Sequence, residues 1–461
     1  MNRKLLKGGT VVSGSGSVPA DVLIEGEKIA AVGTGEEIGR LADRDTEVVD
    51  VSGCLLFPGF IDAHTHFDLH VAGTVTADDF ETGTRAAVRG GTTTIVDFGT
   101  QYPGETLAAG LKNWHEKADG KCSCDYGFHM SITDWNPSVS REIDDMMEAG
   151  VSSFKLYMTY DTQVDDETIF AILRRLKEAG GITGVHCENS GMIAALQAEA
   201  KAAGRMDVSS HPATRPAAAE AEAIGRLLRL AEVVDIPVVV VHLTCREGYN
   251  VIMEARRRGQ KVYAETCPQY LLMDDSLYQL PGMEGAKYVC APPLRGKVDQ
   301  ECLWRALAAG DIQTVSTDHC SFTTEQKLLG KDDFTKIPGG MPGVETRGVL
   351  LYTCGVDQGR ISPEKMCQVL SENPARLYGM FPEKGLIAPG SDADIAVLRT
   401  GVEDVITAGG QLQNVDYAPF EGMKVTARVE QVFLRGTQVV KDGRVAVERA
   451  GKFVRRGNYN L

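Results

Sequence analysis

The sequence predicts an α/β protein: a (β/α)8 barrel of the TIM type with a small β-sandwich domain built from both termini. Between about residue 55 and residue 322, short β-rich runs alternate with helix-like segments. The number of these runs is eight, which is the strand count of a closed barrel of this kind. Both ends of the chain instead show alternating apolar residues and glycine turns, as β-hairpins do.

The eight strand candidates are short and apolar, and several end in polar residues. Segments between them, such as 165–180 and 216–234, carry apolar residues three and four positions apart, which is the period of an amphipathic helix. A doubly wound sheet is the rival architecture, but no glycine-rich nucleotide-binding turn follows an early strand. The predicted strands are 55–66, 91–99, 126–133, 152–160, 182–189, 237–244, 262–271 and 314–322.

Both ends of the chain have the pattern of strands and turns. Residues 4–33 alternate apolar and polar positions around glycines, and 390–401 and 429–448 repeat the pattern near the other end. Neither end offers enough strands for a stable domain alone, so we expect one small β domain assembled from both. The predicted division is 1–53 for the N-terminal part of the small domain, 54–378 for the catalytic barrel, and 379–461 for the C-terminal part and tail.

Composition excludes several classes of partner. Of the 461 residues, 48 are Lys or Arg and 63 are Asp or Glu, a net charge of −15, and an acidic surface repels nucleic acid. The longest apolar runs, such as 237–243, are too short to span a bilayer, and no signal peptide is evident. The eleven cysteines match no disulfide or zinc spacing, which indicates reduced thiols and a cytoplasmic protein.

Polar residues near the predicted strand ends form a candidate metal site. The carboxyl ends of barrel strands line one mouth, where active sites lie. His64 and His66 are two positions apart, so on an extended strand both point to the same side. Imidazole and carboxylate suit Zn, Mn, Fe or Co, and the set exceeds the needs of one ion and suffices for two. The candidate ligands are His64, His66, Lys155, His186, His242 and Asp318.

Lys155 stands in the middle of an apolar strand, where an ammonium is costly to bury. A bare amine has one lone pair and cannot bridge two ions. Its neutral form reacts with CO2 to give a carbamate, whose two oxygens can take one metal each, and burial favours the neutral form. We therefore expect two divalent ions, zinc foremost, and CO2 as a lysine carbamate. The alternative is a lysine that extends from the strand end or forms an ion pair in the core.

The motifs around these residues resemble those of a known family. HTH, SFK, HCEN, VHL and STDH, with longer strings such as FPGFIDAHTHF and DFTKIPGGMPGVE, are similar to the amidohydrolase superfamily and, within it, to dihydropyrimidinase and D-hydantoinase. Allantoinase and dihydroorotase are further relatives. The resemblance implies that the six candidate ligands hold a binuclear centre, with Lys155 as N6-carboxylysine. It also implies that Tyr160, five residues past the lysine, contacts the substrate.

The resemblance implies an activity as well. We expect a hydantoin or dihydropyrimidine ring to be opened to an N-carbamoyl amino acid by a hydroxide that bridges two ions. Asp318 would move the proton to the departing ring nitrogen, and Tyr160 would steady the oxyanion. Allantoinase or another cyclic ureide hydrolase is the alternative activity, and a non-catalytic scaffold protein is a remote one. Relatives are commonly homotetramers and sometimes dimers, and the tail 451–461 is available to reach a neighbour.

The chain also departs from the family pattern. Ala291 stands in APPLR where relatives usually have serine, and Gly339 stands in IPGG where they often have asparagine. In relatives these positions bind the substrate ring largely through backbone groups, which survive a change of side chain, so we expect both to contact the substrate here. The loop 66–74 lacks the usual proline and, with Tyr157, is expected to line the side that receives the exocyclic substituent.

Several other polar residues have simpler interpretations. His129 lies mid-strand and is predicted to be a core residue. His319 follows Asp318 and faces the opposite way along an extended strand, which favours packing over ligation. His211 is predicted to lie on the surface or in a loop. Glu188 and Asn189, beside His186, are candidates to support that histidine.

Overall fold

Eight parallel strands form the central barrel of the computed structural model, which describes residues 3–461. The sheet closes where Thr65 forms a parallel bridge with His319 and the His66 N–H donates to the His319 carbonyl at 2.8 Å. The barrel predicted from the sequence is therefore confirmed. In sheet order the strands are β8 (Phe60–Thr65), β11 (Thr92–Thr100), β12 (Asp125–Ser131), β13 (Ser153–Tyr157), β14 (Ile182–His186), β15 (Val238–Val240), β16 (Val262–Thr266) and β17 (Thr314–Val315).

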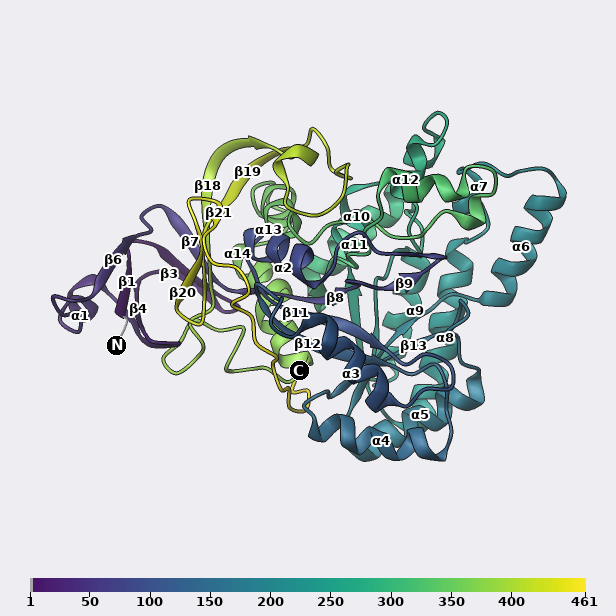
Figure 1. Cartoon of the computed structure of the whole chain (residues 1–461), viewed down its shortest axis with the longest axis horizontal. Coiled ribbons are helices and arrows are strands. Elements are labelled where there is room, and N and C mark those ends of the chain that lie inside the picture. Colours follow the sequence, from purple (N-terminus) through teal and green to yellow (C-terminus); the bar gives the residue numbers. More distant parts are fainter. Residues whose placement is uncertain (1–2) are drawn as a thin grey trace.

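Helices cover the outside of the barrel (Figure 1). In α5 (Asp166–Ala179), the apolar residues that recur three and four apart are buried, the Asp165 carboxylate accepts the Thr168 N–H, and Gly180 ends the helix at φ +75°. The predicted helices 165–180 and 216–234 are thus α5 and α8 (Ala217–Val234). The others that surround the strands are α2 (Phe80–Arg89), α3 (Leu107–Ala118), α4 (Pro137–Glu148), α9 (Arg246–Arg257) and α11 (Lys297–Ala309).

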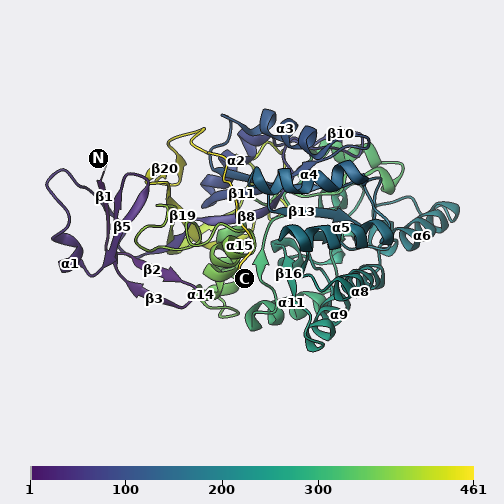
Figure 2. The same ribbon diagram turned by 90° about the horizontal axis from the view of Figure 1, so that it is seen from below.

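The small β domain contains strands from both ends of the chain, as predicted. Figure 1 shows the purple N-terminal strands beside the yellow C-terminal ones, and Figure 2 shows the same neighbourhood from below. One sheet has the order β5 (Lys28–Gly33), β4 (Asp21–Glu25), β1 (Arg3–Lys7), β6 (Glu47–Asp50). The other has the order β21 (Arg444–Val445), β20 (Thr437–Lys441), β19 (Lys424–Leu434), β18 (Ile395–Val405), β7 (Cys54–Pro58), β2 (Thr10–Ser13), β3 (Gly16–Pro19). The domain boundaries at 53/54 and 378/379 stay a prediction.

Several predicted strands differ from the observed ones. The run 55–66 is two strands in two sheets, because the chain leaves β7 of the small domain at Gly59 and enters the barrel as β8. A side chain at Gly59 would collide with Thr93, since a Cβ there would lie 2.0 Å from the Thr93 hydroxyl. The run 262–271 ends early because Pro268 begins helix α10 (Pro268–Leu272), and only two residues of 314–322 form a strand.

The C-terminal tail packs against its own barrel. The Val454 N–H donates to the Tyr126 carbonyl at 2.7 Å, and the Arg456 N–H donates to the Gly150 carbonyl at 2.9 Å. These bonds lie at the amino ends of β12 and β13, opposite to the mouth, so the tail covers the base of the barrel.

Short elements surround the mouth of the barrel. They include the hairpin of β9 (His70–Val71) and β10 (Thr74–Val75), and the helices α6 (Ser190–Ala202), α7 (Ser210–Ala213) and α12 (Thr324–Lys327). Elsewhere lie α1 (Gly35–Gly39), α13 (Arg347–Leu351), α14 (Pro363–Cys367) and α15 (Asn373–Leu377). Over residues 3–461, none of the helices has the length and apolar character that crossing a bilayer requires.

Candidate metal centre and substrate cavity

A cavity of about 1250 Å³ opens at the carboxyl ends of the barrel strands. All six predicted metal ligands line it, and so do the three predicted substrate contacts. Its wall also includes the β9–β10 hairpin and Tyr157. These residues come from elements far apart in the sequence, and the barrel brings them together as the strand-end pattern predicts.

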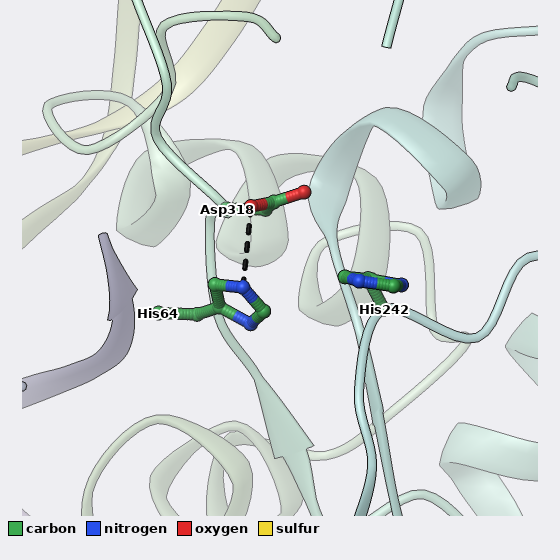
Figure 3. A group of neighbouring side chains, drawn as sticks. All are labelled: His64, His242 and Asp318. Atoms are coloured by element: carbon green, nitrogen blue, oxygen red, sulfur yellow. Dashed lines mark ion pairs between the residues drawn. The ribbon is translucent and has the colours of Figure 1, made fainter. Parts of the chain in front are cut away.

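Three of the predicted ligands form a compact group. Ligand atoms of His64, His242 and Asp318 all lie within 4.8 Å of one another, and Figure 3 shows the Asp318 carboxylate facing His64. His66 joins this group, since its Nε2 lies 3.1 Å from Asp318 Oδ1. His186 lies beside it as well, with its ring centroid 4.5 Å from that of His242.

Two of the histidines are held by buried carboxylates. His64 Nδ1 lies 2.6 Å from Glu265 Oε1, and His186 Nε2 lies 2.8 Å from Glu188 Oε2. Each carboxylate fixes the orientation of its ring and leaves the other nitrogen for the cavity. His64 Nε2 lies 3.2 Å from Asp318 Oδ1, and among residues 3–461 the buried His242 Nδ1 has no hydrogen-bond partner. Imidazole nitrogens gathered beside a carboxylate are a donor set that fits a divalent transition metal.

Burial sets the charge of these groups. It lowers the pKa values of His64, His186 and His242, and the nearby Lys155 charge lowers them further, so the rings are neutral and their lone pairs are available. Burial opposes the ionised form of Asp318, but His64 and His66 favour it and bring its pKa to about 2. Neutral imidazoles around an ionised carboxylate are the protonation states that metal binding requires.

Lys155 is buried inside the barrel. Its strand neighbours Phe154 and Leu156 point outward, and its Nζ lies 4.7 Å from the ring centroid of Phe98 and 5.1 Å from that of Tyr157. Within the described chain, Nζ makes no hydrogen bond or ion pair with a protein group. Burial lowers the pKa of Lys155 to about 8, although Asp318 and Glu265 act in the opposite direction. The alternative, a lysine that forms an ion pair in the core, is therefore not supported, because within residues 3–461 no carboxylate pairs with Lys155.

Backbone strain concentrates at this site. His242, Asp318 and Tyr160 have φ values of +40°, +52° and +71°, in the left-handed region that residues with a Cβ rarely adopt. Such conformations persist only where the surrounding structure enforces them, and they cluster in functional sites. All three lie two or three residues past the end of a barrel strand, and all three line the cavity.

The predicted substrate contacts lie around the same cavity. Tyr160 is half-exposed, and its ring centroid lies 5.0 Å from that of His186. Ala291 and Gly339 line the wall as well. Over residues 3–461, neither the N–H nor the C=O of Ala291 or Gly339 has a protein hydrogen-bond partner. A Cβ at Gly339 would meet no atom within 4 Å, so the family asparagine would project into open space here.

The remaining polar residues show where sequence interpretation was right and wrong. His129 is a core residue, since its two nitrogens contact Ser153 Oγ at 2.6 Å and the Ala63 carbonyl at 3.0 Å. Glu188 supports His186 as expected, but the Asn189 side chain caps α6 instead. The prediction that His211 lies on the surface is wrong.

His211 is buried in the cavity wall, and its Nε2 lies 2.8 Å from the Cys290 carbonyl. Sequence interpretation also missed Glu265, which holds His64. A signal was present, because a glutamate inside the apolar run VYAETC is as costly to bury as Lys155 and implies a specific partner.

Comparison with known proteins identifies the family. The model of the amidohydrolase family matches residues 55–439. A D-hydantoinase of Geobacillus stearothermophilus is 45% identical over 99% of this chain and 97% of its own length. Among solved structures, a dihydropyrimidinase from Brevibacillus agri has a TM-score of 0.97 and 45% identity over all of both chains. An L-hydantoinase from Arthrobacter aurescens has a TM-score of 0.90 and 30% identity over 99% of this chain and all of its own.

The relatives and the fold agree with the strand-end motifs of the sequence. The matches extend over nearly the entire chain, and the cavity lies where a barrel enzyme has its active site. The chain therefore belongs to the amidohydrolase family, in its hydantoinase and dihydropyrimidinase branch, and is a hydrolase of cyclic amide C–N bonds.

Proposed function

We propose that this enzyme opens hydantoin or dihydropyrimidine rings to N-carbamoyl amino acids at a binuclear metal centre that contains a carbamylated lysine. The observation that carries the proposal is the geometry of one wall of the cavity. There, ligand atoms of His64, His242 and Asp318 lie within 4.8 Å of one another, while Lys155 is buried without an ion-pair partner among residues 3–461.

The proposed centre uses the six residues predicted from the sequence. They are His64, His66, carbamylated Lys155, His186, His242 and Asp318. Divalent ions, zinc foremost, would supply water that is deprotonated at neutral pH and would polarise the scissile carbonyl. The carbamate forms when the neutral amine nitrogen of Lys155 bonds to the carbon of CO2 and releases one proton. The low pKa of Lys155 supports it, since more of the amine is neutral than in an exposed lysine.

Asp318 and Tyr160 are the proposed catalytic residues. The Asp318 carboxylate is ionised at neutral pH, so it can accept the proton of the attacking water and then deliver it to the ring nitrogen as the C–N bond breaks. The Tyr160 phenol stays protonated at that pH and can donate a hydrogen bond to the developing oxyanion. Opening the ring then yields a carboxylate and a ureide, with the leaving nitrogen protonated.

Ala291 and Gly339 are proposed to recognise the ureide ring through their backbones. A cyclic ureide presents alternating N–H donors and C=O acceptors, and at the cavity wall the N–H and C=O of both residues have no partner within residues 3–461. This recognition needs no side chain, so the change from the family serine and asparagine is compatible with it.

A substrate panel tests the proposed reaction. Purified enzyme reconstituted with zinc is incubated with dihydrouracil, hydantoin, phenylhydantoin, allantoin and dihydroorotate, and the N-carbamoyl product is measured. We expect turnover of a hydantoin or of dihydrouracil. Turnover of allantoin alone would assign the enzyme to the alternative activity, and no turnover of any ring would contradict the proposal.

A separate experiment tests the lysine. Apoenzyme reconstituted with zinc in 13C-bicarbonate should show a carbamate signal and two bound ions per chain. Lys155→Ala should lose the signal and most activity, and added short carboxylic acids should restore part of it. If Lys155→Ala binds two ions and keeps full activity without added acid, the assignment of Lys155 as the bridging ligand is wrong. The homotetramer implied by the relatives is tested on the same sample by light scattering.

A further inference from the structure

Lys327, at the end of helix α12, is almost completely buried although it belongs to no catalytic motif. Its side chain is only 1% exposed. Its ammonium donates to three backbone carbonyls: that of Val289 at 2.9 Å, that of Pro338 at 2.7 Å and that of Gly340 at 2.7 Å. An ammonium has three N–H groups, so these bonds use all of its donors.

The three carbonyls belong to two separate segments of the cavity wall, Val289–Pro292 and Pro338–Gly340. Lys327 binds both at once, and a direct bond from the Gly340 N–H to the Val289 carbonyl at 2.9 Å joins them. Gly340 has φ +150°, and a Cβ there would lie 2.3 Å from the Cys320 carbonyl. A residue with a Cβ therefore does not fit at this position.

The hydrogen bonds around these segments follow a pattern. Carbonyls that flank Ala291 are taken by protein donors, since Cys290 accepts from His211 Nε2 and Pro292 accepts from the Tyr270 hydroxyl, both at 2.8 Å. The carbonyls that flank Gly339 are both taken by Lys327. Ala291 and Gly339, which line the cavity, are the positions whose own backbone groups have no partner among residues 3–461.

Helix α12 also reaches a third side of the mouth. Gln326, the residue before Lys327, donates through Nε2 to the Thr74 hydroxyl at 2.8 Å and to the Val75 carbonyl at 2.7 Å. One short helix thus connects the β9–β10 hairpin to both backbone segments. Its N-terminus is set by a reciprocal pair of bonds between Thr323 and Gln326.

We propose that Lys327 is a positioning residue for substrate recognition, which holds the two wall segments so that the free backbone groups of Ala291 and Gly339 face the substrate ring. The inference rests on the proposed function, because it assigns the recognised group as a cyclic ureide. Lys327 does not touch the reacting atoms. Its contribution is a fixed spacing between donors and acceptors on two segments that are about fifty residues apart in the sequence.

The variant Lys327→Met tests this role, because it keeps an unbranched side chain only one atom shorter and removes all three donors. We expect KM for the best ring substrate to rise about ten- to a hundredfold, with kcat changed far less, since ring contacts made equally in ground and transition state act on KM. Zinc content should stay at the wild-type value. Hydrogen exchange of backbone amides, measured by mass spectrometry, should accelerate in peptides that contain Gly340, because its N–H donates to the Val289 carbonyl. Exchange in β8 and β15 should not change.

Lys384→Met is the matched control. Lys384 is also buried and fully paired, with Asp125 Oδ2 at 2.8 Å and Asp394 Oδ2 at 2.6 Å, but it lies outside the cavity. We expect this variant to lower the melting temperature without changing KM. If KM rises as much in Lys384→Met as in Lys327→Met, the rise is an effect of general destabilisation, and the proposal is overturned.

The outcomes separate the inference from the proposed function. Wild-type enzyme that opens none of the rings refutes the proposed function. Active wild-type enzyme with an unchanged KM in folded Lys327→Met refutes the positioning role. If Lys327→Met does not fold, Lys327→Gln is tested by the same criteria, because its shorter amide retains two donors. A loss of kcat at constant KM in either variant also counts against the proposal.

Discussion

At the residue scale, His64 and His186 each use one ring nitrogen for a glutamate and leave the other for the cavity. Glu265 takes Nδ1 of His64, and Glu188 takes Nε2 of His186. Arg215 neutralises the second carboxylate: burial disfavours the charged form of Glu188, but Arg215 and His186 lower its pKa to about 2. The two glutamates therefore determine which nitrogen of each histidine is offered to a metal.

Glu265→Gln should weaken metal binding. A neutral amide is a poorer acceptor than a carboxylate for the His64 Nδ1 proton, so the ring is held less firmly and is a weaker donor. We expect the affinity for zinc, measured by competition with a chelator, to fall about 10- to 100-fold. Glu345→Gln, another buried glutamate that lies outside the cavity, serves as the control and should leave the affinity unchanged. Equal affinities of wild type and Glu265→Gln would contradict the assignment.

At the scale of the elements, strands β12 and β13, next to Lys155, pair over few backbone positions. Its ladder joins only Met130 to Phe154 and Ser131 to Lys155, whereas β13 and β14 pair over five residues. Below the paired residues, the Arg456 guanidinium of the tail donates to the Phe128 carbonyl and, at 2.7 Å, to Ser153 Oγ. The tail thus connects the amino ends of the two strands where their own ladder does not.

Arg456→Met should lower the melting temperature by several degrees. It leaves a buried carbonyl without its donor, and an unsatisfied buried group costs about 1–3 kcal/mol. Arg455→Met is the adjacent control: Arg455 is exposed, and surface changes usually stay within about 0.5 kcal/mol. Thermal unfolding followed by circular dichroism compares the three proteins. If Arg456→Met and Arg455→Met have the same melting temperature, the tail does not stabilise the contact between β12 and β13.

At the scale of the whole molecule, buried charges join the barrel to the small domain. Asp125 of β12 pairs with Lys384 and Arg435, and Lys384 also pairs with Asp394 next to β18. Glu345 forms a second junction, since its carboxylate lies 2.9 Å from Arg89 Nη1 of α2 and accepts the Leu412 N–H at 2.7 Å. Burial raises the pKa of Glu345 to about 7, although Arg89 acts in the opposite direction.

The raised pKa of Glu345 predicts how stability depends on pH. The unfolded glutamate titrates near pH 4.3, so between about pH 4.3 and pH 7 the folded protein binds a proton that the unfolded chain has released. Its contribution to stability is fully present below this window and is lost as pH rises through 7. Urea unfolding at pH 5 and pH 8 should show a larger loss of stability in wild type than in Glu345→Gln. Identical differences in the two proteins would refute this pKa.

Much of the fold and site follows from local patterns. Helix α5 matches the predicted 165–180 within two residues, because spacing and caps are local properties. The six candidate ligands line one cavity because strand ends share a mouth once the barrel is accepted. The run 55–66 was misread as one strand, since an apolar run does not encode which sheet each half joins. The Pro58-Gly59 pair, where the chain changes sheets, is the mark of that division in the sequence.

The sequence by itself determined the barrel, the family and the residues of the candidate metal centre. The alternation of strands and helices, the spacing of His64 and His66 and the motifs are local patterns, which can be recognised from residues close together in the chain. Only the tertiary structure decided which groups hold those residues in place. Glu265 bonds a histidine 201 positions away, and Lys327 bonds a carbonyl 38 positions away. Such contacts depend on where the folded backbone brings distant segments together, and no local pattern encodes that distance.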